Sequence, residues 1–335
     1  MATLLDIEGL TISFPNATPV RDLSFQVAEA ETLAIVGESG SGKSLTALAL
    51  MRLLPKTARI ADGSIRFAGE DLVTVPEPAM RERRGRDIAM IFQEPMTSLN
   101  PVLTIGRQIV EVLRLHRGLT RAQARREARD LLDLVRIPDP DRCLDDYPHR
   151  LSGGMRQRVM IAIAVACRPK LLIADEPTTA LDVTIQAQVL ELLDRLRREL
   201  SLALLLITHD LGVVGQWADR VVVMYAGRKV EEAPPEPLFS DPLHPYTQGL
   251  LAASPRLHDD LHYRDSRLSE IPGSISSAVL EKGCPFVPRC PARRDVCRTA
   301  FPYQTITGLG RSVACHAVTP PIATGPSLHD AAVRL

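Results

Sequence analysis

Short apolar runs alternate with polar loops over the first two thirds of the chain. Runs that are apolar throughout predict strands buried on both faces, which is typical of a parallel sheet covered by helices. One run leads through a glycine-rich loop into a helix-forming stretch at 44–54. Strand, glycine loop and helix in this order predict the entry unit of a nucleotide-binding α/β sheet. The predicted strands are 4–10, 23–27, 32–36, 88–92, 171–174 and 202–207.

The middle of the chain, about 104–168, has the pattern of helices. Thr120 and Gln123 form a capping-box pair at the start of one of them. A last hairpin is predicted at Arg220–Glu231, with its turn at Ala226-Gly227. We therefore expect a nucleotide-binding domain over 1–232.

The composition changes sharply at Ala233–Pro237, where three prolines lie within five residues. Proline cannot continue a helix or a central strand, so a domain linker is predicted here. The following residues are rich in proline, serine and cysteine and lack long periodic runs. They predict a small, loop-rich domain, 233–320, that needs more than its own core to hold it. We expect 321–335 to be a disordered tail.

Overall composition narrows the class of protein. Hydrophobic residues make up 45% of the chain, and lysine plus arginine equal aspartate plus glutamate at 40 each. This balance gives no electrostatic reason to expect nucleic acid as a partner. The sequence has no apolar run of about 18 residues and no secretion signal at its start. We therefore expect a cytosolic chain whose six cysteines are free, metal-bound or cluster-bound rather than disulfide-linked.

The loop after the third predicted strand fits the phosphate-binding pattern G-x-x-x-x-G-K-[ST]. Its glycines let backbone N–H groups converge on phosphate oxygens, and the next helix points its positive end at the anion. Lys43 adds a point charge for the β- and γ-phosphates, and Ser44 offers a hydroxyl to Mg²⁺. The predicted nucleotide-binding residues here are Gly37, Glu38, Ser39, Gly40, Ser41, Gly42, Lys43, Ser44 and Leu45.

Two carboxylates, Asp175 and Glu176, end the predicted strand at 171–174. The carboxyl ends of parallel strands face the same crevice as the phosphate-binding loop. Asp175 is expected to hold Mg²⁺, directly or through water, and Glu176 to polarise the attacking water as a general base. His209 follows the strand at 202–207, and this position predicts a contact with the γ-phosphate.

A second anion site is predicted at Leu151–Gln157, whose sequence is Leu-Ser-Gly-Gly-Met-Arg-Gln. Ser152 caps a helix whose free N–H groups, together with Gly153 and Gly154, can bind an anion. A phosphate-loop protein needs only one such site for each nucleotide. The second site therefore implies that ATP bound by a partner chain is contacted across an interface.

This stretch resembles the signature motif of ABC-transporter ATPases, and the other motifs of that family match in order. Phe14 is similar to the aromatic residue that stacks on adenine. Gln93 is similar to the Q-loop glutamine, which senses Mg²⁺ and the transmembrane partner. Ala180-Leu181-Asp182 resembles the D-loop, and His209 resembles the switch histidine. The resemblance covers about 1–320.

The resemblance implies an α/β P-loop NTPase fold with a RecA-like core, an antiparallel β subdomain and a helical subdomain over about 95–168. It implies that ATP lies between the phosphate-binding loop of one chain and the signature loop of the other. Glu176, His209 and Gln93 would be catalytic, and Ser44, Gln93 and Asp175 would hold Mg²⁺. The residues implied to contact the partner's nucleotide are Ser152, Gly153, Gly154, Gln157 and Asp182.

Within the family, three features are similar to importers of dipeptides and oligopeptides. The segment Gln93–Pro101 resembles their extended Q-loop, and His244-Pro245-Tyr246-Thr247 resembles the start of their C-terminal extension. The late cysteines are the third feature. Importers of nickel, glutathione and opines share these features, so they remain alternatives for the cargo.

Four cysteines lie within 32 residues near the end of the chain, with spacings of five, six and seventeen residues. Zinc ribbons usually carry closely spaced cysteine pairs, which are missing here. Wider spacing, with proline after two of the cysteines, favours a cluster of four irons. The resemblance implies a [4Fe–4S] cluster, while zinc, free thiols and a facultative disulfide remain alternatives. The expected ligands are Cys284, Cys290, Cys297 and Cys315.

The resulting hypothesis is the ATP-hydrolysing subunit of a binding-protein-dependent peptide importer, on the cytoplasmic face of the inner membrane. Its expected partners are a second ABC ATPase, in a heterodimer as our first guess, two membrane permease subunits, and through them an extracytoplasmic solute-binding protein. An ABC ATPase of DNA repair or translation is the alternative from another class. Repair types insert coiled coils or zinc modules and translation types carry two cassettes, neither of which is found here.

Overall fold

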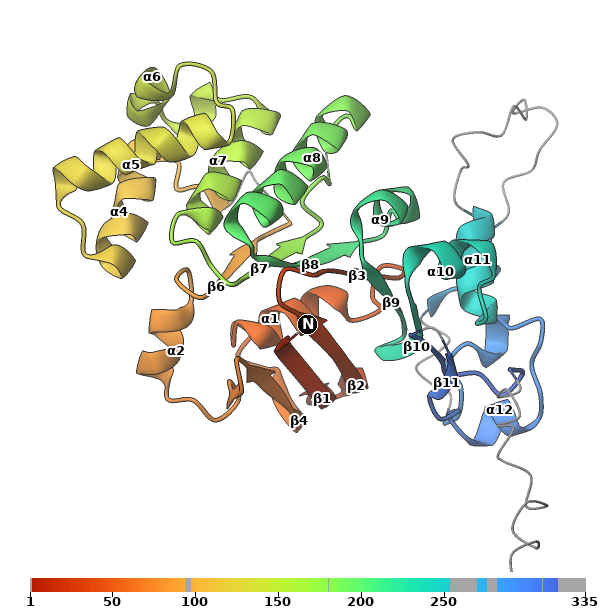
Figure 1. The fold of residues 1–335 in the computed structure, drawn as a ribbon. Helices are drawn as coiled ribbons and strands as arrows, with labels where there is room; N and C mark the ends of the chain where they lie inside the picture. The colour runs from red at the N-terminus through yellow and green to blue at the C-terminus, as the bar shows by residue number, and fades with distance from the viewer. Residues whose placement is uncertain are drawn as a thin grey trace, which may run out of the picture.

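The computed structural model describes residues 2–93, 98–179, 181–253, 270–275, 282–308 and 310–318. The predicted tail at 321–335 lies outside these residues, as do parts of the predicted Q-loop segment and D-loop, namely 94–97 and residue 180. The chain forms one large mixed sheet, a smaller antiparallel sheet and two groups of helices (Figure 1). We call the described residues from 234 to 318 the C-terminal module.

The large sheet has eight strands in the order β11-β12-β10-β9-β3-β8-β7-β6. The five strands β9, β3, β8, β7 and β6 pair in parallel, whereas β10, β12 and β11 are joined antiparallel. All residues of β3, β6, β7 and β8 are buried, as the continuous apolar runs predict. The strands are β3 (Thr32–Val36), β6 (Ile88–Ile91), β7 (Leu171–Asp175), β8 (Ala203–Thr208), β9 (Arg220–Tyr225), β10 (Arg228–Ala233), β11 (Thr305–Gly308) and β12 (Arg311–Val313).

The smaller sheet has the order β2-β1-β4-β5 and packs below the large sheet in Figure 1, with helix α1 beside it. Alternate residues of the buried strands explain the layering: in β7, Leu171 and Ile173 face this layer, whereas Leu172 and Ala174 face the opposite one. Its elements are β1 (Thr3–Phe14), β2 (Ala17–Ala28), α1 (Lys43–Leu50), β4 (Arg59–Phe67), β5 (Glu70–Asp71) and α2 (Glu77–Arg83).

Helix α1 is shorter than the predicted 44–54. It ends at Leu50, because Arg52 adopts a left-handed φ of +49° and Pro55 disfavours helical geometry just before it. The helix is otherwise placed as predicted, directly after the glycine-rich loop. Its position at the carboxyl end of β3 brings the loop to the edge where β7 and β8 also end.

The opposite face of the large sheet carries helices α4 to α8 (Figure 1). The predicted capping box is confirmed: the Thr120 side chain accepts from the Gln123 N–H, and the Gln123 side chain accepts from the Thr120 N–H. These helices form an apolar cluster with β6, β7 and β8, which confirms the helical middle of the chain. They are α4 (Ile105–Arg117), α5 (Arg121–Leu134), α6 (Pro140–Asp145), η1 (Pro148–Arg150), α7 (Gly153–Val165) and α8 (Val183–Leu200).

The proline-rich stretch after β10 is not an extended linker. It begins a short helix, because proline is tolerated in the first helical turn, where its missing N–H has no partner to lose. The hairpin of β9 and β10 turns at Ala226-Gly227 as predicted. The elements around and after it are α9 (Leu211–Trp217), α10 (Pro235–Ser240), α11 (Pro245–Ala253), η3 (Val287–Arg289) and α12 (Val296–Thr299).

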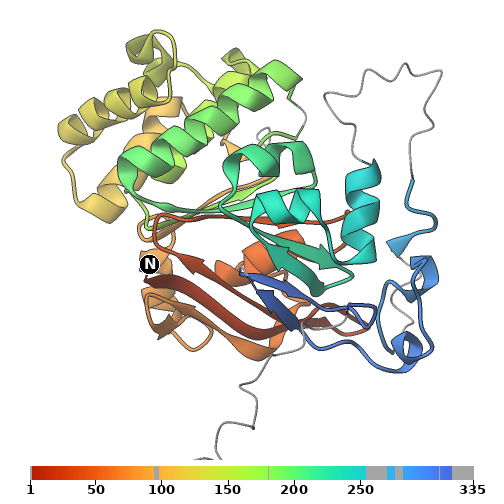
Figure 2. The ribbon, with the colours of Figure 1, turned by 45° about the vertical axis from the view of Figure 1, so that its right-hand side comes forward.

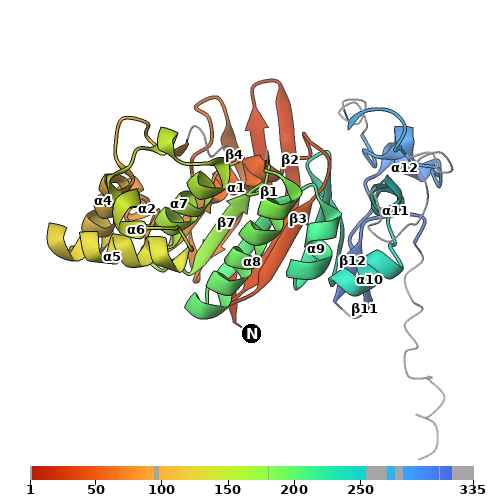
Figure 3. The ribbon, with the colours of Figure 1, turned by 90° about the horizontal axis from the view of Figure 1, so that it is seen from above.

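The C-terminal module does not have an apolar core separate from the sheet. Leu238, Tyr246, Phe286 and Val287 belong to one buried cluster with strand residues such as Val223. The hairpin of β11 and β12 also extends the large sheet beyond β10 (Figure 2). Seen from above, the module and helices α4 to α6 lie at opposite ends of the molecule (Figure 3). The domain boundary at 232 stays a prediction, since the sheet continues across it.

Candidate functional site

The loop Gly37–Ser44 joins β3 to α1, and two glycines allow its tight course. A Cβ on Gly37 would lie 2.2 Å from the carbonyl oxygen of Met224, and one on Gly42 would lie 2.8 Å from that of Pro19. Gly42 also has a φ of +98°, a conformation that side chains disfavour. The loop therefore runs directly against neighbouring backbone.

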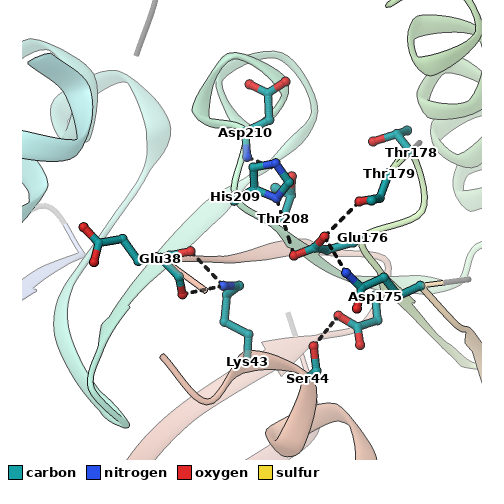
Figure 4. A network of polar contacts seen from close by, with 12 residues as sticks. Glu38, Lys43, Ser44, Asp175, Glu176, Thr178, Thr179, Thr208, His209 and Asp210 are labelled. Carbon is teal, nitrogen blue, oxygen red and sulfur yellow. Dashed lines mark hydrogen bonds and ion pairs between the residues drawn. The ribbon is translucent and has the colours of Figure 1, made fainter. Parts of the chain in front are cut away.

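The Lys43 side chain is buried beneath this loop, where it lies 4% exposed. Its Nζ donates to the carbonyl oxygens of Gly37 and Glu38 at 2.7 and 3.0 Å (Figure 4). Burial lowers the pKa of Lys43, and the carboxylates of Glu176 and Asp175 oppose this shift. A phosphate group at the loop would give this partly desolvated ammonium an anionic partner in place of neutral carbonyls.

Ser44 and Asp175 lie together although 131 residues separate them. The Ser44 hydroxyl donates to Asp175 Oδ1 at 3.0 Å. Burial raises the pKa of Asp175, and the Ser44 hydrogen bond acts against that shift. A hydroxyl and a carboxylate are hard oxygen donors of the kind that Mg²⁺ prefers, and a cation would offset the cost of burying the carboxylate. These residues therefore fit a magnesium ion.

The Glu176 carboxylate is the centre of the polar cluster at the end of β7. Its Oε2 accepts from Gln93 Nε2 at 2.9 Å and from the Thr179 hydroxyl at 2.8 Å. His209 Nδ1 lies 3.4 Å from Oε1, and the histidine side chain is 63% exposed. Glu176 has a left-handed φ of +46°, held by an N–H bond to the carbonyl of Ile207 on β8. This strained backbone turns the carboxylate toward the edge of the sheet shown in Figure 4.

The predicted signature residues lie at the start of α7, on the helical layer. Ser152 is the N-cap and accepts from the N–H three residues later at 3.3 Å, and both Ser152 and Gly153 are exposed. Gly154 is close to helix α8, because a Cβ there would lie 3.0 Å from Ile185 Cγ2. Asp182 is exposed and caps α8.

Gln157 is placed differently from the other predicted signature residues. It is 1% exposed, within the buried face of α7. Neither its side-chain nitrogen nor its oxygen has a hydrogen-bond partner in the described part of the chain. The structure thus does not bring this side chain to the surface beside Ser152.

The remaining predicted residues surround the phosphate-binding loop at varying depth. Ser39 and Gly40 are exposed at its tip, whereas Ser41 is buried and its carbonyl accepts from Gly227 N–H at 3.0 Å. Leu45 packs against the apolar cluster between the large sheet and the smaller antiparallel sheet. Phe14 is half-buried at the last position of β1.

Sequence reasoning missed three side chains of this region. Thr179 binds Glu176, and its place three residues later, after a proline, is the signal for a turn that could have found it. Tyr246 and Arg289 both bind Glu38 of the phosphate-binding loop. No local signal marks these two, because more than 200 residues separate each from its partner.

Two family models match the chain. Residues 20–179 match the family described as ABC transporter, and residues 230–297 match the C-terminal region of oligopeptide/dipeptide transporters. A peptide import ATP-binding protein of Brucella abortus is 54% identical over 319 residues, covering 94% of this chain and 95% of that protein. The oligopeptide transport ATP-binding protein AppD of Bacillus subtilis is 50% identical over 321 residues, covering 94% and 97%.

The chain belongs to the ABC-transporter family of ATP-binding proteins. A solved structure agrees with this assignment: the dimeric structure of the ATP-binding cassette MJ0796 bound to ADP and Pi has a TM-score of 0.62 and 25% identity. The match covers 70% of this chain and 99% of the cassette. The P-loop fold expected from the sequence is confirmed. Among the described residues of this ABC ATPase, none of the helices has the length and apolarity needed to cross a membrane.

The predicted iron–sulfur cluster is wrong. Across the described residues, which include all four late cysteines, no group of three or more His, Cys, Asp or Glu side chains is arranged to hold a metal ion. Burial raises the pKa of Cys284 to about 12 and also raises that of Cys290 and Cys315. Cys143, Cys167 and the four late cysteines are all free thiols.

The cluster was predicted from the spacing of the cysteines and from the family resemblance, and neither shows where the cysteine side chains lie. Cys284, Cys290 and Cys297 instead pack in the buried cluster that contains Tyr246 and the strand residue Tyr225. The large sheet supplies the apolar surface that the module lacks. Thiols in such a place behave as small apolar side chains.

Proposed function

We propose that the chain is the ATP-hydrolysing subunit of an ABC importer for peptides. One observation carries this proposal: the Glu176 carboxylate lies beside His209 and Gln93, one residue after the Asp175–Ser44 pair. A phosphate-binding loop alone would support nucleotide binding. A carboxylate held next to it, oriented by three side chains, is what hydrolysis requires.

The phosphate groups of ATP are proposed to bind the N–H groups of Gly37–Ser44 and the ammonium of Lys43. Lys43 would exchange the carbonyls of Gly37 and Glu38 for the β- and γ-phosphates. Ser44 and Asp175, with Gln93, would hold Mg²⁺. When bound, this ion supplies charge neutralisation on the β- and γ-phosphate oxygens. Phe14, at the end of β1, is the proposed stacking partner of adenine.

Glu176 is proposed to accept the proton of the attacking water. Both of its carboxylate oxygens have partners here, since Oε2 binds Gln93 and Thr179 and Oε1 faces His209. A water in line with the γ-phosphate would take the place of one of these partners. His209, whose side chain is exposed beside Glu176 Oε1, is proposed to contact the γ-phosphate itself.

Hydrolysis is proposed to belong to a pair of ATPase chains. Ser152 and Gly153 expose a helix N-terminus that suits an anion, yet it lies on the helical layer rather than on the loop after β3. The related cassette MJ0796 is dimeric in its ADP-bound structure. Ser152–Gly154 and Asp182 would contact ATP held by the partner chain, whereas the predicted contact of Gln157 is not proposed because its side chain is buried. A heterodimer with a second ABC ATPase is the proposed form.

The proposed further partners are two membrane permeases and, through them, an extracytoplasmic solute-binding protein. With these partners the chain would lie at the cytoplasmic face of the inner membrane. Peptides are the proposed cargo, because the relatives are named for peptide import and the C-terminal match is to oligopeptide/dipeptide transporters. The names of the relatives favour peptides over nickel, glutathione or opines, and a transporter subunit over a repair or translation ATPase.

Replacement of the proposed base tests the assignment. Glu176→Gln keeps the shape and the hydrogen bonds of the side chain but removes its basicity, so ATP turnover should fall by about 100-fold or more while ATP binding persists. Glu191→Gln, the same exchange on the exposed face of α8, is the matched control and should leave turnover unchanged. Turnover at the wild-type rate in Glu176→Gln would refute the role of this carboxylate.

A further inference from the structure

Glu38, the second residue of the phosphate-binding loop, is held by two side chains of the C-terminal module. Its backbone N–H donates to the Tyr246 hydroxyl at 2.8 Å. Its carboxylate accepts from both terminal nitrogens of Arg289, at 2.7 Å for Oε2 and 3.0 Å for Oε1. A bidentate pair of this kind fixes geometry as well as contributing energy. The backbone N–H and the carboxylate of Glu38 are therefore both bound by residues from far along the chain.

The Arg289 guanidinium is anchored on every side. Its side chain is 5% exposed, and it donates to the carbonyls of Pro272 and Ile271 at 2.8 and 3.1 Å and to the Tyr225 hydroxyl at 3.3 Å. The Glu38 side chain is 26% exposed, so the pair is partly buried, and the buried guanidinium is the partner more sensitive to loss of the pair. Removing Arg289 would leave the Glu38 carboxylate without its two donors.

The Tyr246 hydroxyl is fixed just as firmly. The buried ring packs against Tyr225 and Phe286, with centroid distances of 4.5 and 5.4 Å. The backbone N–H of Tyr246 donates to His244 Nδ1 at 3.0 Å, and the backbone N–H of His244 donates to the carboxylate of Glu231 on β10 at 2.9 Å. A series of contacts thus connects the large sheet, the start of α11 and the phosphate-binding loop.

These contacts act on the part of the loop that positions Lys43. The Lys43 ammonium binds the carbonyls of Gly37 and Glu38, so a rotation of the peptide on either side of Glu38 would displace it. The Glu38 N–H is also withheld from phosphate, because Tyr246 already accepts it. The loop tip is bordered by the module as well: Ile275 Cγ2 lies 3.7 Å from where a Cβ of Gly40 would be.

We propose that Arg289 and Tyr246 form a clamp on Glu38 that holds the phosphate-binding loop in its nucleotide-binding shape, so that the C-terminal module sets the affinity for ATP. The proposal rests on the proposed nucleotide site at 37–44. Arg289 and Tyr246 are positioning residues, since they act through Glu38. If their contacts only fastened the module to the sheet, losing them would lower stability but leave the ATP affinity of the folded protein unchanged.

The test is titration of the full-length protein with a fluorescent ATP analogue, well below the unfolding temperature. Tyr246→Phe removes one hydroxyl and keeps the ring, and Arg289→Met removes the charge and keeps the length. Each should raise Kd about tenfold. In steady-state ATP hydrolysis, the KM for ATP should rise while kcat stays within about twofold. Arg289→Lys should recover part of the affinity, because it restores one donor.

Controls separate the clamp from general loosening. Leu238→Ala removes a buried side chain of α10 that has no part in the clamp, so it should lower stability while Kd remains that of the wild type. In Glu38→Gln, the further change Arg289→Met should have less effect on Kd than it has in the wild type. Wild-type Kd in both Tyr246→Phe and Arg289→Met would overturn the clamp. Failure of the wild type itself to bind the analogue would instead overturn the proposed function.

Discussion

The large sheet and the C-terminal module both contact the phosphate-binding loop, and they do so with different kinds of side chain. The buried residues of β3 and β8 are aliphatic or small, apart from one threonine in each. The module reaches the same loop with tyrosine rings, the buried His244 and the ion pair of Arg289. Aliphatic packing tolerates a local change, whereas a buried polar network is favourable only while every member has its partner. The loop therefore combines a robust support with a sensitive one.

The largest effect is expected from a change in the backbone of the loop itself, where neither support can compensate. Gly37→Ala would place a Cβ 2.2 Å from the Met224 carbonyl oxygen, so the loop must move away from β9. We expect the affinity for ATP to fall by about 100-fold or more in the same titration. Gly40→Ala is the matched control: it strains a φ of +83°, but the nearest atom is 3.7 Å from its Cβ, so its loss should be much smaller. Equal losses would contradict this account of the loop.

A change in the shared apolar cluster tests whether the module unfolds with the sheet. Phe286 is 1% exposed, between Tyr225 and Tyr246, so Phe286→Ala should cost about 3–4 kcal/mol. By calorimetry we expect one transition, lowered by about 10 °C, as for Leu33→Ala within the sheet. A new early transition with the main one unchanged would show that the module unfolds separately.

An acidic pH should distinguish the two regions as well, because His244 is a buried neutral group. Burial lowers its pKa from 6.5 to about 3. Below pH 6.5 His244 is protonated in the unfolded chain but stays neutral in the folded chain. The free energy of unfolding therefore decreases as the pH is lowered, and at pH 5 it is about 2 kcal/mol smaller than at neutral pH. His244→Asn removes this titration, and its Oδ1 can still accept the Tyr246 N–H.

The two proteins are compared by urea unfolding at pH 7.5 and pH 5. The stability difference between them should shift by about 2 kcal/mol in favour of His244→Asn at the lower pH. Buried Glu231 is present in both, so its own titration cancels in the comparison. A difference that does not change with pH would mean that His244 is protonated within the fold.

The smallest effect is expected far from the loop. Thr120 caps α5 at the opposite end of the molecule, and Thr120→Ala should cost about 1 kcal/mol with no change in the Kd for ATP. Thr184→Ala, at an exposed position inside α8, is the control and should be near neutral. An altered Kd in Thr120→Ala would show that the helical layer acts on the loop too.

The contrast between the regions also decides what the sequence could predict. Six predicted strands were located correctly, and four of them, β3, β6, β7 and β8, are buried on both faces and therefore leave a continuous apolar signal. Strand β4 was missed, since most of its residues are at least partly exposed and its pattern is weak. The site residues Lys43, Ser44, Asp175 and Glu176 are brought together as the phosphate-loop pattern predicts.

The packing of the C-terminal module could not be predicted from the sequence, for a physical reason. Its order depends on a surface made by Val223, Tyr225 and other strand residues, which no local pattern near residues 244–318 reveals. The cluster was predicted from the cysteine spacing and the resemblance, whereas packing against the strands is what orders these residues. Arg289 illustrates the same limit, because its partner Glu38 lies 251 residues away.

The pairing of β12 with β10 has a consequence for the synthesis of the chain. Glu231 and Glu232 of β10 pair with Val313 and Ser312, so the backbone donors and acceptors along β10 stay open until those residues have left the ribosome. An unpaired strand edge is a template for association with other chains. A truncated chain that ends soon after Ala233 should therefore aggregate more readily than the full-length chain, in which the hairpin of β11 and β12 covers this edge of β10.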